Sequence, residues 1–253
     1  MRINHNLMAM NTHRQLGINN TRGSKAMEKL SSGLRVNRAA DDAAGLSISE
    51  KMRGQIRGLT QAARNTQDGI SFIQTAEGAL NEVSAMLVRM KELAVQYANG
   101  TLSSEDQANI ESELTQLAEE ITNISENSTF NGISLFSTIE IVISDDDTDT
   151  FEIGIENIEI DLTENTTEEI EDAIDAVNTA RAKLGAQQNR LEHIYNNINT
   201  TTENLQAAEA RIRDTDMALE MVEFTKNYIL QQAALAMLAQ ANQVPQGVLQ
   251  LLR

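Results

Sequence analysis

An apolar residue recurs every seven positions through the C-terminal half of the chain. The repeat begins at Ile170 and continues to Leu219, and a second, mostly apolar set follows each member by three positions. Alternating spacings of three and four place one stripe along a single α-helix, which is the pattern of a coiled-coil seam. A continuous helix of this extent is on the order of 80 Å long. The sequence therefore predicts a rod rather than a globule.

Three polar residues interrupt the second set of this repeat. They are Gln187, Thr201 and Thr215. Polar side chains at such positions weaken a dry core, and they fix the register of packed helices more often than they carry chemistry. We interpret them as register residues.

A second repeat predicts a helical hairpin in the N-terminal half. Apolar residues alternate at spacings of three and four from Ile73 to Tyr97, and the stripe ends at Asn99-Gly100, a natural helix stop. Ser103 or Ser104 can cap the next helix, and the same alternation resumes at Ile110 and continues to Ile124. Two such helices joined by a short loop form an antiparallel pair.

The middle of the chain changes to the two-residue period of strands. Isoleucine and phenylalanine alternate with polar residues over 139–143, 151–155 and 158–162, which predicts a small β-hairpin near 137–165. The acidic link 145–150 has carboxylates at some EF-hand offsets, but Thr150 stands where the calcium loop needs glycine and strands flank it. We therefore interpret it as a solvated turn.

Charge is distributed unevenly. The net charge is -17, yet residues 1–70 hold 11 basic and 5 acidic side chains, whereas residues 71–180 hold 2 basic and 25 acidic ones. This balance argues against general nucleic-acid binding, which needs clustered Lys and Arg. We expect the acidic middle to face solvent, because so many like charges could not be buried between neighbours.

The two ends carry thin apolar stripes. Residues 1–40 and 223–253 have apolar residues at helical spacing, but too few to offset chain entropy in an isolated molecule. We predict that both termini are disordered alone and become ordered only against partners.

No catalytic or membrane-inserting motif is apparent. The three histidines are scattered, there is no cysteine, and phosphate-loop, dinucleotide, zinc-protease and nucleophile-elbow motifs are absent. The sequence shows no secretory signal peptide and no apolar run of about 20 residues. It therefore predicts no enzyme activity, no cofactor, no metal and no membrane insertion.

Several stretches closely resemble bacterial flagellins. In the N-terminal part they include LSSGLRVN at 30–37, DDAAGL at 41–46, QTAEGAL at 74–80 and RMKELAVQ at 89–96; in the C-terminal part they include RAKLGA at 181–186, NRLE at 189–192 and LAQANQVPQ at 238–246. They occur in the family's order at both ends and cover most of the chain except about 137–165.

The resemblance implies a mostly α fold. It indicates an elongated antiparallel helical, coiled-coil bundle formed by the N- and C-terminal halves, with a small central β-hairpin. Residues 1–44 with 209–253 are expected to form an inner terminal coiled-coil domain, disordered in the monomer, and 45–208 a helical rod domain. The large outer domains of many flagellins are expected to be absent here.

The resemblance also implies a function and partners. The chain is expected to polymerise with itself into the extracellular filament for motility, after unfolded export through the flagellar type III apparatus without a cleaved signal peptide. Expected partners are an export chaperone on the C-terminal segment, the filament cap, and hook-junction proteins. The residues assigned to terminal assembly and chaperone binding are Leu235, Leu238, Val244, Val248, Leu249 and Leu252.

A receptor site is implied by the run at 89–96. In flagellins the matching stretch is read by the vertebrate Toll-like receptor for flagellin, and the positions that carry over are Arg89, Glu92 and Leu93. Helical spacing puts these on one face, offset from the predicted seam, so we expect them to be available to the receptor and to a neighbouring protofilament. The competing interpretation is that Arg89 and Glu92 form only an intrahelical ion pair and Leu93 packs on a neighbouring subunit.

Three other functions compete with a filament subunit. A hook-filament junction protein shares the terminal heptads, although the ending 244–253 and the run 89–96 favour a flagellin. A soluble coiled-coil module that docks a helical partner is the second, and an enzyme is the third. A filament subunit and a hook-filament junction protein would both grow on filament ends, whereas the docking module would not.

Overall fold

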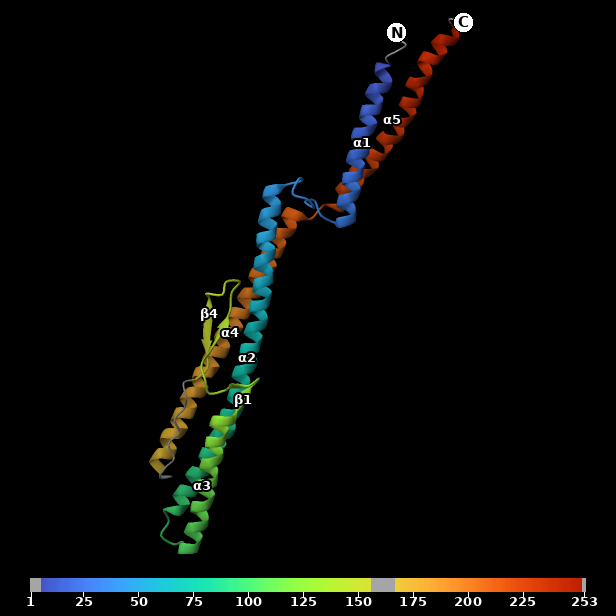
Figure 1. The fold of residues 1–253 in the computed structure, drawn as a ribbon. Coiled ribbons are helices and arrows are strands. Elements are labelled where there is room, and N and C mark those ends of the chain that lie inside the picture. Colours follow the sequence, from blue (N-terminus) through green and yellow to red (C-terminus); the bar gives the residue numbers. More distant parts are fainter. Residues whose placement is uncertain (1–5, 156–166, 252–253) are drawn as a thin grey trace. The chain divides into compact units, whose positions relative to one another are not determined.

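The computed structural model describes residues 6–155 and 167–251, and this part of the chain is predominantly helical (Figure 1). Its helices are α1 (Leu7–Ser32), α2 (Ala43–Tyr97), α3 (Ser104–Asn127), α4 (Thr167–Arg213) and α5 (Met217–Leu251). Its strands are β1 (Thr129–Phe130), β2 (Ile133–Ser134), β3 (Ile139–Val142) and β4 (Thr150–Ile153). The predicted mostly α fold with a small central hairpin is confirmed. No described helix is long and apolar enough to cross a membrane.

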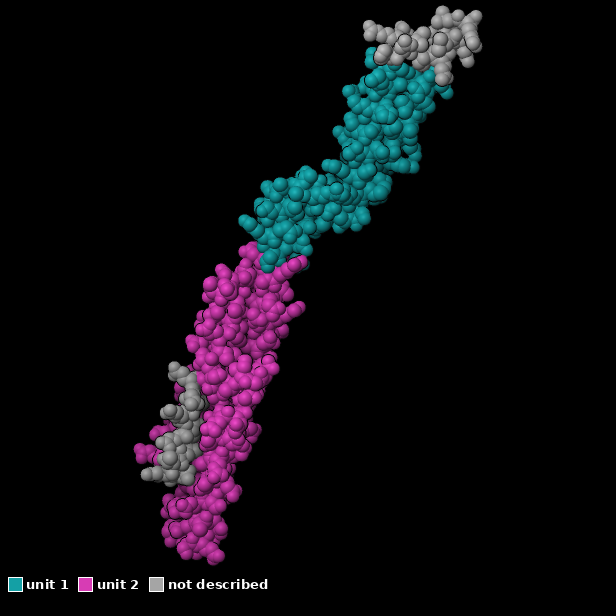
Figure 2. Space-filling view, in the orientation of Figure 1, with its two compact units in different colours: residues 1–54, 205–253 teal, residues 55–204 magenta. Residues whose placement is uncertain are grey.

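The chain divides into two compact units (Figure 2). Unit 1 comprises Met1–Gly54 and Leu205–Arg253, and unit 2 comprises Gln55–Asn204. Helices α2 and α4 each contribute residues to both units. The division at 44/45 and 208/209 into an inner terminal domain and a helical rod domain remains a prediction.

The core of unit 2 follows the predicted seams. Residues of the stripe from Ile73 to Ala94 are buried, and the heptad residues Ile170, Val177, Leu184 and Leu191 of α4 join the same apolar cluster. The buried residues of α3 are Ile110, Leu114 and Ile121. Three helices therefore share one apolar core, as heptad spacing predicts for packed helices.

A capping box begins α3. The Ser103 hydroxyl oxygen accepts a hydrogen bond from Asp106 N at 3.2 Å, and the Asp106 carboxylate accepts one from Ser103 N at 3.3 Å. The hydroxyl and the backbone N–H of Ser103 lower the pKa of Asp106, because both donate to the charged carboxylate. Of the two candidate caps, Ser103 is the one used.

The predicted continuous helix from Ile170 to beyond Leu219 is wrong. Helix α4 ends at Arg213 and α5 begins at Met217, although the heptad continues across the break. Backbone pairing with the segment after α1 replaces the helical bonds: Arg213 O accepts from Arg35 N at 2.6 Å, and Thr215 N donates to Gly33 O at 3.0 Å. The Asp216 carboxylate then caps α5.

Two antiparallel hairpins follow α3. Strand β3 pairs with β4 in the register Ile139↔Ile153 and Val142↔Thr150, and the acidic turn 145–150 between them is exposed. The third predicted strand at 158–162 lies outside the described residues. The small β1–β2 hairpin was not predicted; it closes on Asn131 and Gly132, with φ values of 52° and 83°.

Glycines of α2 allow the larger hairpin to approach this helix closely. A Cβ atom at Gly69 would lie 2.8 Å from Ile153 Cδ1, and one at Gly58 would lie 2.7 Å from the Cβ of Asp145. A side chain at Gly58 would collide with the backbone of Asp145, whose Cα would lie 2.9 Å away, whereas one at Gly69 would have to push aside the terminal methyl groups of Ile141 and Ile153. Because Gly58 and Gly69 are about three helical turns apart, both lie on the same face of α2, and the hairpin packs along that face.

In unit 1, α1 and α5 pack side by side (Figure 1). Few side chains are buried between them; those in α5 are Asn227, Ala234 and Ala241. Lys29 Nζ and Glu220 Oε2 form an ion pair at 3.7 Å across the two helices. Helices α1 and α5 thus pack on a thin interface. That the terminal segments become ordered only on assembly remains a prediction about the isolated subunit.

Candidate assembly surface

Large apolar side chains are exposed on both helices of unit 1. We call this set the terminal apolar surface. Its members on α1 are Leu7, Met8, Met10, Ile18 and Met27, and those on α5 are Met217, Leu219, Met221, Val222, Tyr228, Ile229, Leu230, Leu235 and Met237. Monomeric proteins rarely expose so much apolar surface, and such a patch marks an interaction site.

The burial pattern of α5 shows how many sides of this helix lack a partner. The buried residues Asn227, Ala234 and Ala241 recur every seven positions and so form one stripe, which faces α1. Leu219 is 66% exposed and Ile229 is 59% exposed, and both lie away from that stripe. A helix with apolar residues around most of its circumference is normally buried, so α5 has room for further partners.

The predicted terminal site residues lie on this helix. Leu235 is half exposed, whereas Leu238 and Val244 are partly buried. Leu252 and the side chains of Val248 and Leu249 lie outside the described residues. The residues with the greatest exposure, such as Leu219 and Val222, were missed because they belong to the seam that the sequence extends past Arg213.

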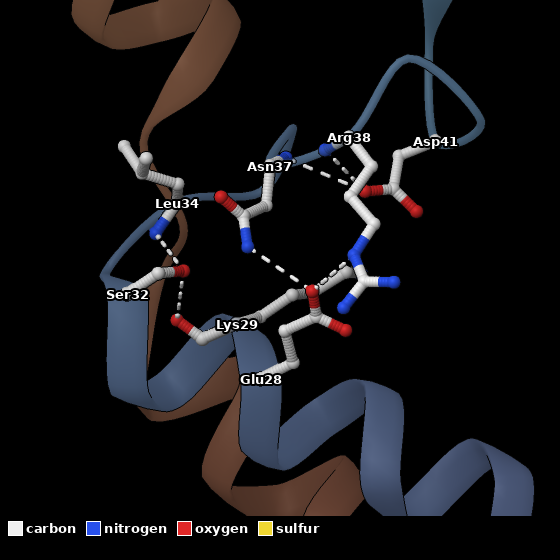
Figure 3. Close-up of polar contacts among 7 residues, drawn as sticks. All are labelled: Glu28, Lys29, Ser32, Leu34, Asn37, Arg38 and Asp41. Atoms are coloured by element: carbon white, nitrogen blue, oxygen red, sulfur yellow. Dashed lines mark hydrogen bonds and ion pairs between the residues drawn. The ribbon is translucent and has the colours of Figure 1, made fainter.

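The segment between α1 and α2 is held by polar contacts (Figure 3). The Asp41 carboxylate accepts from Arg38 N at 3.0 Å and from Asn37 N at 3.3 Å, and Glu28 Oε1 accepts from Arg38 Nε at 2.7 Å. The Arg38 N–H lowers the pKa of Asp41, with help from nearby Lys25 and Lys29. The motif LSSGLRVN therefore has a structural role: it forms the turn that pairs with the end of α4.

Arg213 links the beginning of α2 to the end of α4 within unit 1. Its guanidinium Nη1 donates to Glu50 Oε1 at 2.8 Å, and Glu209 lies 3.9 Å away. The hydrogen bond from Arg213 lowers the pKa of Glu50. These contacts support the backbone pairing of residues 213–215 with 33–36.

The predicted receptor residues do not share one exposed face. Arg89 and Glu92 are exposed and form the expected intrahelical ion pair at 3.1 Å, and Arg89 Nη2 also contacts Glu113 Oε1 of α3 at 3.1 Å. Both carboxylates raise the pKa of Arg89, Glu92 most strongly.

Leu93, in contrast, is only 2% exposed and belongs to the core, so the prediction that its side chain is available is wrong. Helix α2 contributes to a core shared with two helices, so its buried face is wider than one seam.

Unit 2 also has an open groove of about 580 Å³ beside α2. Asp68, Phe72, Phe130, Ile133 and Glu140 are among its lining residues. Within the described ranges, no group of three His, Cys, Asp or Glu residues could hold a metal ion.

Two family models match nearly all of the chain. The bacterial flagellin N-terminal helical region matches residues 3–140, and the bacterial flagellin C-terminal helical region matches residues 167–252. The chain belongs to the bacterial flagellin family. A flagellin is a structural protein, and this flagellin chain is a subunit that polymerises into the extracellular flagellar filament.

Relatives of this flagellin chain align over their whole length. It is 54% identical to a flagellin of Halalkalibacterium halodurans and 48% identical to a flagellin of Bacillus subtilis, with 100% of each chain covered in both pairs. A solved structure of a putative flagellar hook-associated protein from Vibrio parahaemolyticus has a TM-score of 0.57 at 15% identity, covering 69% of this chain and 98% of the other. That likeness concerns the fold alone, and nothing favours the hook-junction alternative.

Proposed function

We propose that this flagellin chain polymerises mainly through the terminal apolar surface of α1 and α5. One observation carries the proposal: α5 buries a single stripe against α1 and exposes apolar side chains on its other sides. Burying such side chains against further copies contributes about 25 cal/mol for each Å² of apolar surface removed from water. Polymerisation by this route needs no catalytic group and no cofactor.

The double variant Leu219→Ser, Ile229→Ser tests this proposal. Both side chains are exposed in the subunit, so the substitutions preserve its helical content while removing apolar contact area. Seeded growth followed by light scattering and negative-stain microscopy should be strongly reduced. The matched control is Gln232→Ser, a polar and exposed position of the same helix, which should grow normally. Filament growth by the double variant at the rate of the unsubstituted chain would exclude this surface as the main contact.

The same surface supports a proposal about export. The thin α1–α5 interface lets unit 1 open easily, which suits passage of an unfolded chain through the flagellar type III apparatus without a cleaved signal peptide. An export chaperone would cover the apolar residues of 223–253 before export, and the cap and hook-junction proteins would meet the same terminal helices in the filament. Leu235→Ser with Leu238→Ser should abolish co-purification with the host's flagellin chaperone. Unchanged co-purification would place the chaperone elsewhere.

Recognition by the Toll-like receptor for flagellin remains a proposal in a modified form. Arg89 and Glu92 offer charged contacts directly, whereas Leu93 acts by packing α2 in the core. Arg89→Ala with Glu92→Ala should reduce signalling by monomer. Arg181→Ala is the control, because Arg181 forms an ion pair with Glu77 at 3.8 Å elsewhere in unit 2. Full signalling by the double variant would rule out this assignment.

A further inference from the structure

Two Asn-Gly steps occur in the chain, at Asn99-Gly100 and Asn131-Gly132. In such a step the backbone nitrogen of glycine can attack the side-chain amide carbon of the asparagine before it, because glycine has no side chain to obstruct the approach. The rate depends on how freely the backbone at that step can rotate into the attacking geometry. The two steps differ sharply in this respect.

Asn99 lies in the open loop between α2 and α3. Its side chain is exposed, and neither its amide nor the N–H of Gly100 makes a hydrogen bond within the described chain. A Cβ atom added at Gly100 would meet nothing within 4 Å. Two hydrogen bonds hold the turn, from Asn99 N to Gln96 O at 3.1 Å and from Leu102 N to Asn99 O at 3.4 Å. The second is long and holds the peptide unit of Gly100 only through its carbonyl oxygen, since the Gly100 nitrogen itself donates to no atom of the described chain.

Asn131, in contrast, is restrained by a hairpin. It adopts φ 52° and Gly132 adopts φ 83°, the left-handed conformations of a two-residue turn between paired strands. The ring of Phe130 packs edge-on against Phe72 with centroids 6.0 Å apart, which anchors β1 on α2. Rotating the Asn131 backbone toward the attacking geometry would break this pairing.

We propose that Asn99 is a site of spontaneous deamidation, through a succinimide formed with Gly100. The Gly100 backbone nitrogen loses its proton and forms a bond to Asn99 Cγ, the bond from Cγ to the amide nitrogen breaks, and ammonia leaves. Water then opens the five-membered ring at either carbonyl, giving aspartate or isoaspartate. No oxidant, cofactor or enzyme takes part.

The product changes the end of α2 in two ways. A carboxylate at position 99 adds negative charge just after Tyr97, where the helix dipole already disfavours it, and close in sequence to Glu105 and Asp106. An isoaspartate also lengthens the main chain by one methylene group within a short loop. A filament subunit outside the cell would accumulate this change with age.

Peptide mapping of the full-length chain, incubated at mildly alkaline pH, tests the proposal. Isoaspartate and aspartate should appear at position 99 several-fold faster than at position 131. In denaturant, where the hairpin is absent, the two sites should react at similar rates. Hydroxylamine, which cleaves succinimides, should produce a fragment that begins at Gly100.

Gly100→Ala supplies the matched variant. Open space surrounds Gly100 and its φ is not in the left-handed region, so alanine fits without strain. This variant should lose most of the deamidation at Asn99 and leave the rate at Asn131 unchanged. The proposal is overturned if Asn131 reacts as fast as Asn99 in the folded chain, or if Gly100→Ala leaves the Asn99 rate unchanged.

Discussion

The side-chain amide of Gln187 binds both backbone polar groups of Gly154. Its Oε1 accepts from Gly154 N at 3.2 Å, and its Nε2 donates to Gly154 O at 3.2 Å. Gln187 lies on α4 and Gly154 directly follows β4, so this pair ties the hairpin to the helix. The polar seam residue thus fixes the position of a neighbouring element.

Replacing Gln187 by leucine should destabilise unit 2. The substitution leaves the N–H and carbonyl of Gly154 unpaired, which costs about 1–3 kcal/mol. Urea unfolding followed by circular dichroism measures the change. Gln188→Leu, at the neighbouring position that pairs only with Glu192, should change stability much less. Equal effects of the two substitutions would show that the contact with Gly154 is unimportant.

Gly154→Ala should also destabilise the protein. Gly154 has φ 127°, and an added Cβ would lie 3.0 Å from Thr138 Cα and overlap Ser137 O. Strain of this kind costs about 1–3 kcal/mol. Gly78→Ala is the control: its Cβ meets nothing within 4 Å, and alanine in a helix interior is favoured over glycine by about 1 kcal/mol. Thermal unfolding should therefore shift in opposite directions for the two variants.

Leu93→Ala should lower the free energy of unfolding by about 2–5 kcal/mol, because it opens a cavity in the shared core. Val95→Ala, two positions away and 59% exposed, should change it by less than about 0.5 kcal/mol. Denaturant unfolding of both variants measures the difference. A Leu93→Ala variant as stable as Val95→Ala would contradict the burial of this side chain.

Protonation of Glu50 should weaken the contact with Arg213 in acid. The pKa of Glu50 is lowered in the folded state, so its contribution to stability is present above the unfolded-state value and is lost as pH falls through the folded-state value. The stability difference between the unsubstituted chain and Glu50→Gln should therefore shrink below about pH 4. Thermal unfolding across that range measures it, with Glu203→Gln as an exposed control. A difference that stays constant in acid would contradict the ion pair.

Local patterns predicted much of unit 2. The seams from Ile73 to Ala94 and from Ile170 to Leu191 are buried as spacing indicates, and the cap at Ser103 is one of the two that the sequence allows. The alternation that predicted the hairpin at 139–153 also holds. The seams, the cap and the hairpin each depend on residues that are near one another in the sequence.

Contacts between distant segments explain what the sequence did not predict. The break after Arg213 occurs although the apolar repeat continues to Leu219, because residues 33–36 supply backbone partners that no local pattern reveals. The local indications are the polar seam residue Thr215 and Asp216, a good helix cap. A single seam predicts an exposed Leu93, whereas α2 packs against two other helices and buries this side chain in the shared core. The exposed residues Leu219 and Val222 of α5 are not predicted because the sequence places them in the seam that continues past this break.

The pairing of the segment after α1 with the end of α4 also sets an order of folding. The contact between Arg35 and Ile212 joins residues 177 positions apart, whereas the helical hairpin of α2 and α3 closes through a short loop. Closing a long loop costs more entropy, so distant pairings form late. While synthesis has not yet reached residue 213, residues 33–36 have no backbone partner. We therefore expect unit 1 to remain open until synthesis is nearly complete, so that residues 33–36 stay without their backbone partners for most of the chain's synthesis.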